Sequence, residues 1–203
     1  MRHTVFVISK SLRTTSGMPC GRIIRAAVLT CALAIAFGPL YTESGYDWSR
    51  HSISELAAQH TANAWIMRTG LICLGLASIA AYWCRRPSLN VFFLLFGACI
   101  ALSGLFSHKP FIDGRPYAEW LDRLHSALAS LGGMSAVAAF FTLTIKSKTS
   151  AGRVVNASIA LGFTGLSAAM FIWPDYQGIF QRMIFAAFIV WVLLVGTGSE
   201  TTR

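Results

Sequence analysis

One polar stretch of this chain, YDWSRHSISELAAQH at residues 46–60, combines residue types that could do chemistry. Within fourteen residues it holds acids, histidines and serines: Asp47, Ser49, His51, Ser52, Ser54, Glu55 and His60. Imidazole and carboxylate groups could bind zinc and activate a water molecule, and a serine beside a histidine could act as a nucleophile. The rest of the sequence must supply the elements that position these groups.

The composition indicates a membrane protein. Hydrophobic residues make up 55% of the chain, with 14 Phe and 6 Trp, and only 12% of the residues are charged. A bilayer core about 30 Å thick requires roughly 20 apolar residues for each helical span. Six such stretches occur, at residues 23–41, 63–83, 91–107, 124–144, 154–173 and 180–198. Because no alternation with period two is present, we predict an all-α, polytopic bundle of six transmembrane helices.

The domain organisation follows from these spans. We predict a basic tail over 1–21, a six-helix membrane domain over 22–198 and a short tail over 199–203. The first span could instead be a secretory signal peptide, but it is long for one and no clean cleavage site of small residues follows it. We expect a retained helix, with either Met1 or Met18 as the start.

The charges favour one orientation of the bundle. The tails, the foot of the first span and the loops after the second and fourth spans carry 11 of the 17 Lys and Arg residues and one acid, Glu200. The opposite loops hold the other seven acids. Since Lys and Arg favour the cytoplasmic side, we expect both termini in the cytoplasm of a prokaryotic cell, with the chain in its plasma (inner) membrane. The net charge of +9 then describes a rim facing anionic lipid, and no nucleic-acid partner is expected.

The five cysteines are expected to be reduced or buried thiols. Cys20 and Cys84 fall on the predicted cytoplasmic side, and Cys31, Cys73 and Cys99 fall within spans. Disulfides are favoured in oxidising compartments, and none of these cysteines lies in a predicted outer loop. We therefore predict no disulfide.

The polar stretch falls in the loop between the first two spans, at the outer face. SISE fits a capping box, with Ser52 as N-cap and Glu55 three residues later. One mostly apolar helical stripe follows: Ile53, Leu56, Ala57, His60 and Ala64. We predict a short amphipathic helix here, which accounts for Ser52 and Glu55 but not for the histidines.

The outer end of the bundle collects most of the ionisable groups. Four of the five histidines are expected there: His51, His60, His108 and His125. His125 begins the fourth span, and ionisable groups at membrane depth usually face the bundle interior. Arg68 and Arg182 belong to the same layer, although both could extend to the interface as surface residues. We predict one cluster in which His125 faces Glu55, with Arg68 or Arg182 nearby.

Four short motifs resemble a prokaryotic six-helix membrane family known as the domain of unknown function nine-nine-eight. They are SRHSISEL after the first span, GLFSHKP at the end of the third, LHSALA opening the fourth and QRMIFAAF opening the sixth. The family is distantly similar to the damage-regulated autophagy modulator group, which is linked to lipid handling. The resemblance covers about residues 23–198 and implies no established reaction. It draws attention to Ser54, Glu55, Leu56, Gly104, Phe106, His125 and Arg182.

The sequence leaves three classes of function open. The first is a non-enzymatic protein that binds a membrane lipid headgroup or a membrane-protein partner, through Arg68, Arg123, Arg182, Ser54 and Glu55. If Arg68 and Arg182 hold phosphate, they should converge on an open pocket.

The third class, a small transporter, would use inverted repeats that this sequence shows only vaguely.

The second class is an intramembrane hydrolase acting on a lipid. Zinc is the one cofactor considered, with His51, His60, His108 and His125 as candidate ligands. His125, Glu55 and Asp47 are the candidate catalytic residues. These ligands come from separate segments, because no two histidines stand four residues apart on a helix. A serine device pairing Ser52 or Ser54 with His125 is a further alternative, in which Ser52 already serves as a cap.

Overall fold

The computed structural model describes residues 17–84 and 90–194 of the chain. The longer helices are α2 (Gly17–Tyr41), α4 (Ala64–Cys84), α5 (Val91–Leu105), α6 (Glu119–Lys146), α7 (Ser150–Ile172) and α8 (Gln177–Leu194). Two short elements join them, the helix α3 (Ile53–Leu56) and the 3-10 helix η1 (Pro174–Tyr176). The predicted tails over 1–16 and 199–203 lie outside the described residues, and α2 begins within the predicted basic tail.

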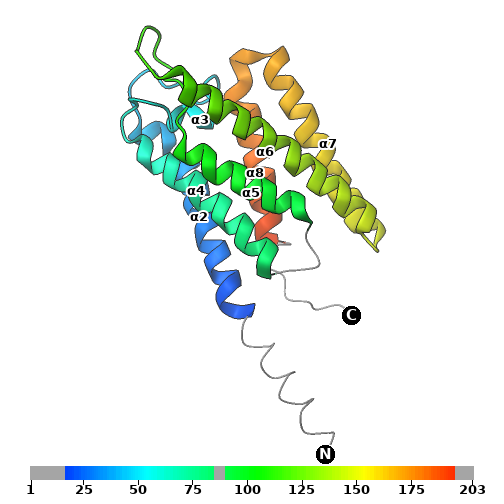
Figure 1. Cartoon of the computed structure of the whole chain (residues 1–203). Helices are drawn as coiled ribbons and strands as arrows, with labels where there is room; N and C mark the ends of the chain where they lie inside the picture. The colour runs from blue at the N-terminus through cyan, green and yellow to red at the C-terminus, as the bar shows by residue number, and fades with distance from the viewer. Residues whose placement is uncertain (1–16, 85–89, 195–203) are drawn as a thin grey trace, which may run out of the picture.

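The six longer helices form a ring in chain order (Figure 1). Each packs against the next, and α2 packs against α8 to close the ring. Five are long and apolar enough to cross a membrane, whereas α5 has only 15 residues. The prediction of an all-helical polytopic membrane protein is confirmed, and no strand occurs in the described part of the chain.

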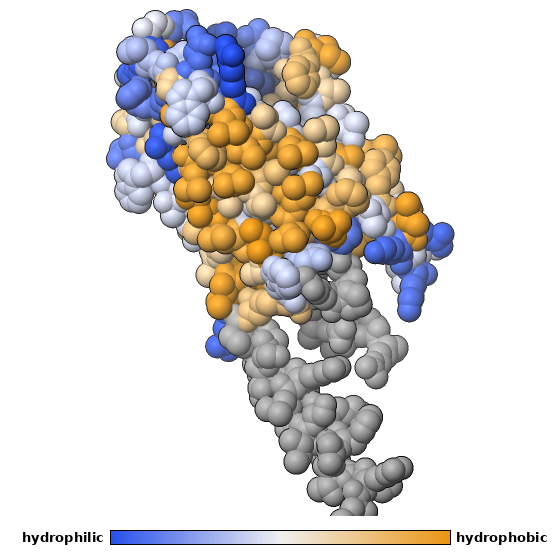
Figure 2. Space-filling view, viewed as in Figure 1, coloured by the Kyte–Doolittle hydropathy of each residue, from blue (hydrophilic) through white to orange (hydrophobic). Residues whose placement is uncertain are grey.

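The surface supports the same conclusion. Figure 2 shows a broad hydrophobic band over the helices and a hydrophilic region at the end that holds the loops between α2 and α4 and between α5 and α6. Large apolar side chains are exposed in this band, as at Leu33, Ile145 and Phe171. We call the hydrophilic end, with α3 and these loops, the plug end. Acyl chains of a bilayer are the solvent that such a band requires.

Aromatic side chains fill the ring on the side away from α3. Phe93 of α5 stacks on Trp191 of α8 with ring centroids 5.2 Å apart, and Phe140 of α6 meets the same indole edge-on at 5.0 Å. Phe163 of α7 and Phe188 of α8 pack edge-on around Phe140. Side chains from four helices therefore share one aromatic cluster that ties the two halves of the ring together.

The helices α4 and α5 approach each other closely at glycines. A Cβ atom added to Gly75 would lie 2.5 Å from the carbonyl oxygen of Gly97, and one added to Gly104 would lie 2.9 Å from the carbonyl oxygen of Arg68. On α6, Gly132 packs against Cys99 of α5, whereas no atom would meet a Cβ added to Gly133. Of these adjacent glycines in α6, only Gly132 serves helix packing.

The predicted capping box at the start of α3 is confirmed. Ser52 Oγ accepts from the Glu55 amide, and the Glu55 carboxylate accepts from the Ser52 amide. The prediction that the helix continues past His60 is wrong, because α3 ends at Leu56. His60 and Asn63 both have φ of 55°, a left-handed conformation that interrupts a right-handed helix. The apolar stripe is buried inside the ring at Ile53 and Leu56.

The prediction that no disulfide forms is also wrong. Cys20 of α2 is bonded to Cys84 of α4, and Cys31, Cys73 and Cys99 are free. The two cysteines are 64 residues apart in sequence, and the packing of α2 against α4 brings their Cα atoms to 6.8 Å. This proximity depends on the helix pairing and is not visible in the spacing of the cysteines.

Candidate functional site

Residues 52–59, which we call the plug, fill the plug end of the ring. Seven of these eight residues are buried, although the segment is polar at four positions. The exception is Ser54, which keeps partial exposure. Because buried polar groups need hydrogen-bond partners, the surrounding helices must supply them.

The start of the plug is held from α8 and from the loop after α2. The amide of Ile53 donates to Gln181 Oε1, and the Tyr46 hydroxyl donates to the carbonyl oxygen of Ser52 at 2.9 Å. Burial raises the pKa of Tyr46 to about 12, so this hydroxyl stays protonated at neutral pH. Together with the capping box, these contacts fix the backbone immediately before Ser54.

The end of the plug is held from α4 and from the loop between α5 and α6. Arg68 donates from Nε to the carbonyl oxygen of Ala57 and from Nη2 to that of Ala58, both at 2.9 Å. The Gln59 side-chain amide donates to the carbonyl oxygens of Ser107 and Ala118. Arg68 therefore caps the C-terminal end of α3, where free carbonyl groups and a partial negative charge attract a cation.

His125 of α6 contacts the plug at Ser54. Its Nε2 lies 3.0 Å from Ser54 Oγ, and its Nδ1 lies 2.9 Å from the Ser103 carbonyl oxygen and 2.8 Å from that of Phe106. A carbonyl oxygen can only accept, so Nδ1 carries the proton and Nε2 is left to accept from the serine hydroxyl. His125 as a whole is 1% exposed. His125 thus faces the interior as expected, but its partner is Ser54, whereas the Glu55 carboxylate binds the Ser52 amide.

Arg182 holds the loop before the plug onto α8. Its Nη1 donates to the carbonyl oxygens of Trp48 and His51, and its Nη2 donates to the Tyr46 hydroxyl at 2.6 Å. The loop can approach because α8 has Gly178 at this point, where a Cβ atom would lie 2.5 Å from the same two carbonyl oxygens. In the described residues no carboxylate lies within salt-bridge distance of Arg182. In this region its charge is stabilised by carbonyl and hydroxyl dipoles and by the Tyr46 ring, whose centroid is 5.8 Å from the guanidinium carbon.

The other predicted site residues are dispersed over the plug end. His51 packs against Phe111 with ring centroids 4.9 Å apart, and its Nδ1 accepts from the Asp47 amide. The Ser49 hydroxyl and amide bind the Asp47 carboxylate and lower its pKa. His60 is exposed. Arg123 is ion-paired with Glu119 one helical turn away.

The candidate zinc ligands do not converge as a set. His108 lies beside His125, with ring centroids 5.2 Å apart, and its Nε2 is 3.6 Å from Asp122. His51 belongs to the separate group around Tyr46. Across residues 17–84 and 90–194, no three His, Cys, Asp or Glu side chains are arranged to hold a metal ion.

An ion pair links the two large loops of the plug end. Arg115 binds both carboxylate oxygens of Glu43, at 2.8 and 2.7 Å, and also donates to the His60 carbonyl oxygen. These hydrogen bonds lower the pKa of Glu43. The pair therefore ties the two loops together at neutral pH.

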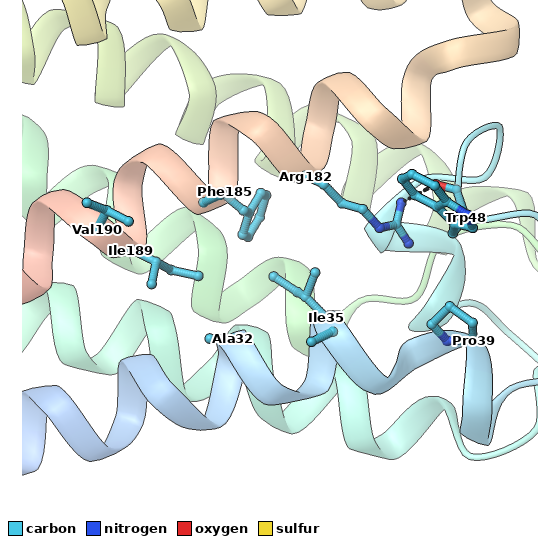
Figure 3. Close-up of a pocket in the computed structure, with 10 residues that line it drawn as sticks. Ala32, Ile35, Pro39, Trp48, Arg182, Phe185, Ile189 and Val190 are labelled. Atoms are coloured by element: carbon cyan, nitrogen blue, oxygen red, sulfur yellow. Dashed lines mark hydrogen bonds between the residues drawn. The ribbon is translucent and has the colours of Figure 1, made fainter.

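A groove runs between α2 and α8 below the loop that Arg182 holds (Figure 3). It has a volume of about 370 Å³. Its apolar walls are Ala32, Ile35, Ala36 and Pro39 from α2 and Phe185, Ala186, Ile189 and Val190 from α8. Figure 3 shows the Arg182 guanidinium beside Trp48 at one end, with the aliphatic side chains extending away from them. The groove is apolar along its length and cationic at the plug end.

Sequence reasoning missed several residues that build this site. Gln59, Gln181 and Tyr46 each bind backbone groups of the plug or its neighbours, and Gly178 makes room for the loop. A signal was present for the glutamines, because Gln59 and Gln181 are uncharged polar residues at the borders of apolar stretches. No sequence signal distinguished Gly178 from the other glycines.

The chain was compared with known proteins. Residues 25–198 match a family described as "Protein of unknown function (DUF998)". The chain belongs to the DUF998 family. This confirms the resemblance carried by the four motifs, and the match spans α2 to the end of α8. No curated protein and no solved structure matches this DUF998 protein.

Proposed function

We propose that this DUF998 protein binds a membrane phospholipid, with one acyl chain in the groove between α2 and α8 and the phosphate beside Arg182. The observation that carries the proposal is the combination of an apolar groove between two apolar helices with a cation at one end. An acyl chain gains free energy from complementary contacts, and a guanidinium offers a phosphate paired hydrogen-bond donors.

The charge balance of Arg182 supports this proposal over one that uses the other arginines. Arg123 is already neutralised by Glu119, and Arg68 binds two buried carbonyl oxygens on the far side of the plug. Arg182 is half-buried and has only carbonyl and phenol oxygens as partners. An anion arriving at the groove would therefore meet an uncompensated positive charge.

Native mass spectrometry of the delipidated protein tests the proposal. We expect phosphatidylglycerol to be retained and diacylglycerol, which lacks phosphate, to be held roughly tenfold more weakly, since a hydrogen bond to a charged group is worth about 1.5–3 kcal/mol. Arg182→Gln should reduce phosphatidylglycerol to the level of diacylglycerol. Ala186→Phe, which fills the groove, should reduce the retention of both lipids.

The matched control uses a second groove, of about 330 Å³, between α2 and α4. Its lining residues include Leu33, Trp65 and Thr69 and no charged residue. Thr69→Phe should therefore leave phosphatidylglycerol retention unchanged. Equal retention by the wild-type, Ala186→Phe and Thr69→Phe proteins would contradict the proposal.

We also infer that the plug end faces outward from a prokaryotic inner membrane, with both termini in the cytoplasm. The distribution of Lys and Arg supports this orientation. The disulfide between Cys20 and Cys84 argues in the opposite direction, because it lies at the end that this orientation places in a reducing compartment. The two arguments conflict, and accessibility distinguishes them.

Thiol labelling of intact cells measures the orientation directly. In a chain whose native cysteines are replaced by alanine, Gly114→Cys at the plug end should react with an impermeant maleimide. Ser147→Cys, in the loop between α6 and α7, should react only after the cells are permeabilised. The reverse pattern would place the plug end in the cytoplasm and would make the disulfide extracytoplasmic.

A further inference from the structure

We propose that Ser54 and His125 form a nucleophile and general-base pair that reacts with an acyl ester of a lipid. This activity does not depend on the groove between α2 and α8, so it can be tested separately from lipid retention there. The hydrogen bond of 3.0 Å between Ser54 Oγ and His125 Nε2 is within the range required for proton transfer from a nucleophile to its base.

The protonation state of His125 is fixed by its other nitrogen. The carbonyl oxygens of Ser103 and Phe106 both accept from Nδ1, and both belong to the C-terminal end of α5. In serine hydrolases a carboxylate orients the histidine and stabilises its charged form. Here two carbonyl oxygens at the negative end of a helix dipole would do the same. Nε2 is thereby left unprotonated, as a general base must be.

The position of Ser54 is fixed on both sides. The capping box joins Ser52 to Glu55 and so spans it, the bond from the Ile53 amide to Gln181 lies before it, and the two bonds from Arg68 lie after it. A nucleophile held in this way loses little conformational freedom when it reacts. The capping serine, Ser52, has a different role, since its hydroxyl accepts from the Glu55 amide.

The two residues of the pair differ in their exposure. His125 is 1% exposed, whereas Ser54 is the one residue of the plug that is not buried. The base is therefore shielded, whereas the serine keeps partial exposure. On α6 the next residue, Ser126, is exposed.

The depth of the pair indicates the class of substrate. Ser54 is paired with His125, which lies in the second turn of α6, a helix long and apolar enough to cross a membrane. The pair therefore lies near the end of a span, where hydrocarbon gives way to headgroups. The ester groups of glycerolipids occupy this boundary between headgroups and hydrocarbon. An ester carbonyl is also the electrophile that a serine and histidine pair attacks. A lipid ester thus satisfies both the position and the chemistry.

The reaction balances with water as the only co-reactant. Ser54 Oγ bonds to the ester carbonyl carbon while its proton moves to His125 Nε2. The ester C–O bond then breaks, and the alcohol leaves with that proton. Water attacks the acyl-serine and gives a proton to the same nitrogen. The acid leaves, and Ser54 regains its proton from His125.

A long-chain alkyl fluorophosphonate tests the pair in the full-length protein in detergent. We expect Ser54 Oγ to bond to phosphorus with loss of fluoride, and mass spectrometry of the wild-type protein to place the adduct on Ser54. Ser54→Ala should abolish labelling. His125→Asn should slow it by at least about 100-fold, the usual contribution of a general base. Ser126→Ala, at the exposed serine next to His125 on α6, is the matched control and should label at the wild-type rate.

Every outcome of the labelling experiment either supports or contradicts the proposal. An adduct on Ser54 that depends on His125, together with release of fatty acid from phosphatidylglycerol vesicles, supports the proposal. Absence of an adduct on folded wild-type protein, an adduct elsewhere, or labelling unaffected by His125→Asn would show that the pair is only a structural contact between the plug and α6. Because the adduct is located in the wild-type protein, this outcome does not depend on whether a variant folds.

Discussion

Gly75→Ala should lower the free energy of unfolding by about 2–3 kcal/mol, the cost of overpacking a close helix contact. The new methyl group would lie 2.5 Å from the Gly97 carbonyl oxygen and 2.7 Å from the Ala101 Cβ atom. Its nearest neighbours include backbone atoms of α5, which cannot move aside as a flexible side chain can. Thermal unfolding in detergent, followed by the loss of monodisperse protein, measures the change.

The same substitution at Gly162 or Gly133 is the matched control. Nothing lies within 4 Å of a Cβ atom added at either position, and both glycines are inside helices. Alanine should stabilise each helix by about 0.5–1 kcal/mol, because glycine loses more backbone entropy on folding. If Gly75→Ala behaved like these two variants, the close packing of α4 against α5 would be incorrect.

Arg68→Met should lower the free energy of unfolding by about 3 kcal/mol. The substitution keeps much of the apolar stem but removes both donors to the carbonyl oxygens of Ala57 and Ala58. These residues are 1% and 0% exposed, so their carbonyl groups would stay buried without their charged partner, at about 1–3 kcal/mol each. Arg68→Lys, with a single ammonium group, should restore only part of the loss.

Arg123→Met is the control for this prediction. Arg123 makes an ion pair with Glu119 in which the two side chains are 80% and 68% exposed. An exposed pair of this kind contributes at most about 0.5 kcal/mol. A loss at Arg123 as large as that at Arg68 would mean that the two arginines act through charge and not through the plug.

The two functional proposals concern neighbouring segments of the plug end, the plug itself and the loop before it. The plug brings Ser54 to His125, and the loop before it brings Trp48 to Arg182 at the head of the groove. Gln181 and Arg182 are adjacent on α8. Gln181 binds the plug at the Ile53 amide, and Arg182 binds the loop before the plug at the His51 carbonyl oxygen. The start of α8 therefore contacts both the plug and the loop at the head of the groove.

The sequence by itself determined the helices and the local structure of the polar stretch. Runs of apolar residues must form helices in a bilayer because each backbone group has to be paired within its own segment. For this reason the predicted second span, 63–83, differs from α4 by a single residue at each end. The capping box joins Ser52 and Glu55 through each other's backbone amides, so their spacing of three residues was sufficient to predict it.

Only the tertiary structure decided which distant groups meet. Ser54 and His125 are 71 residues apart, and Cys20 and Cys84 are 64 apart, so their pairing depends on how the ring closes. Helices in a membrane pack through close contacts of small residues, as at Gly75, and no residue type reveals its partner in advance. The prediction that His125 faces Glu55 was wrong by one residue. Burial of Ile53 and Leu56 turns Ser54 toward α6, and the Glu55 carboxylate binds the Ser52 amide instead.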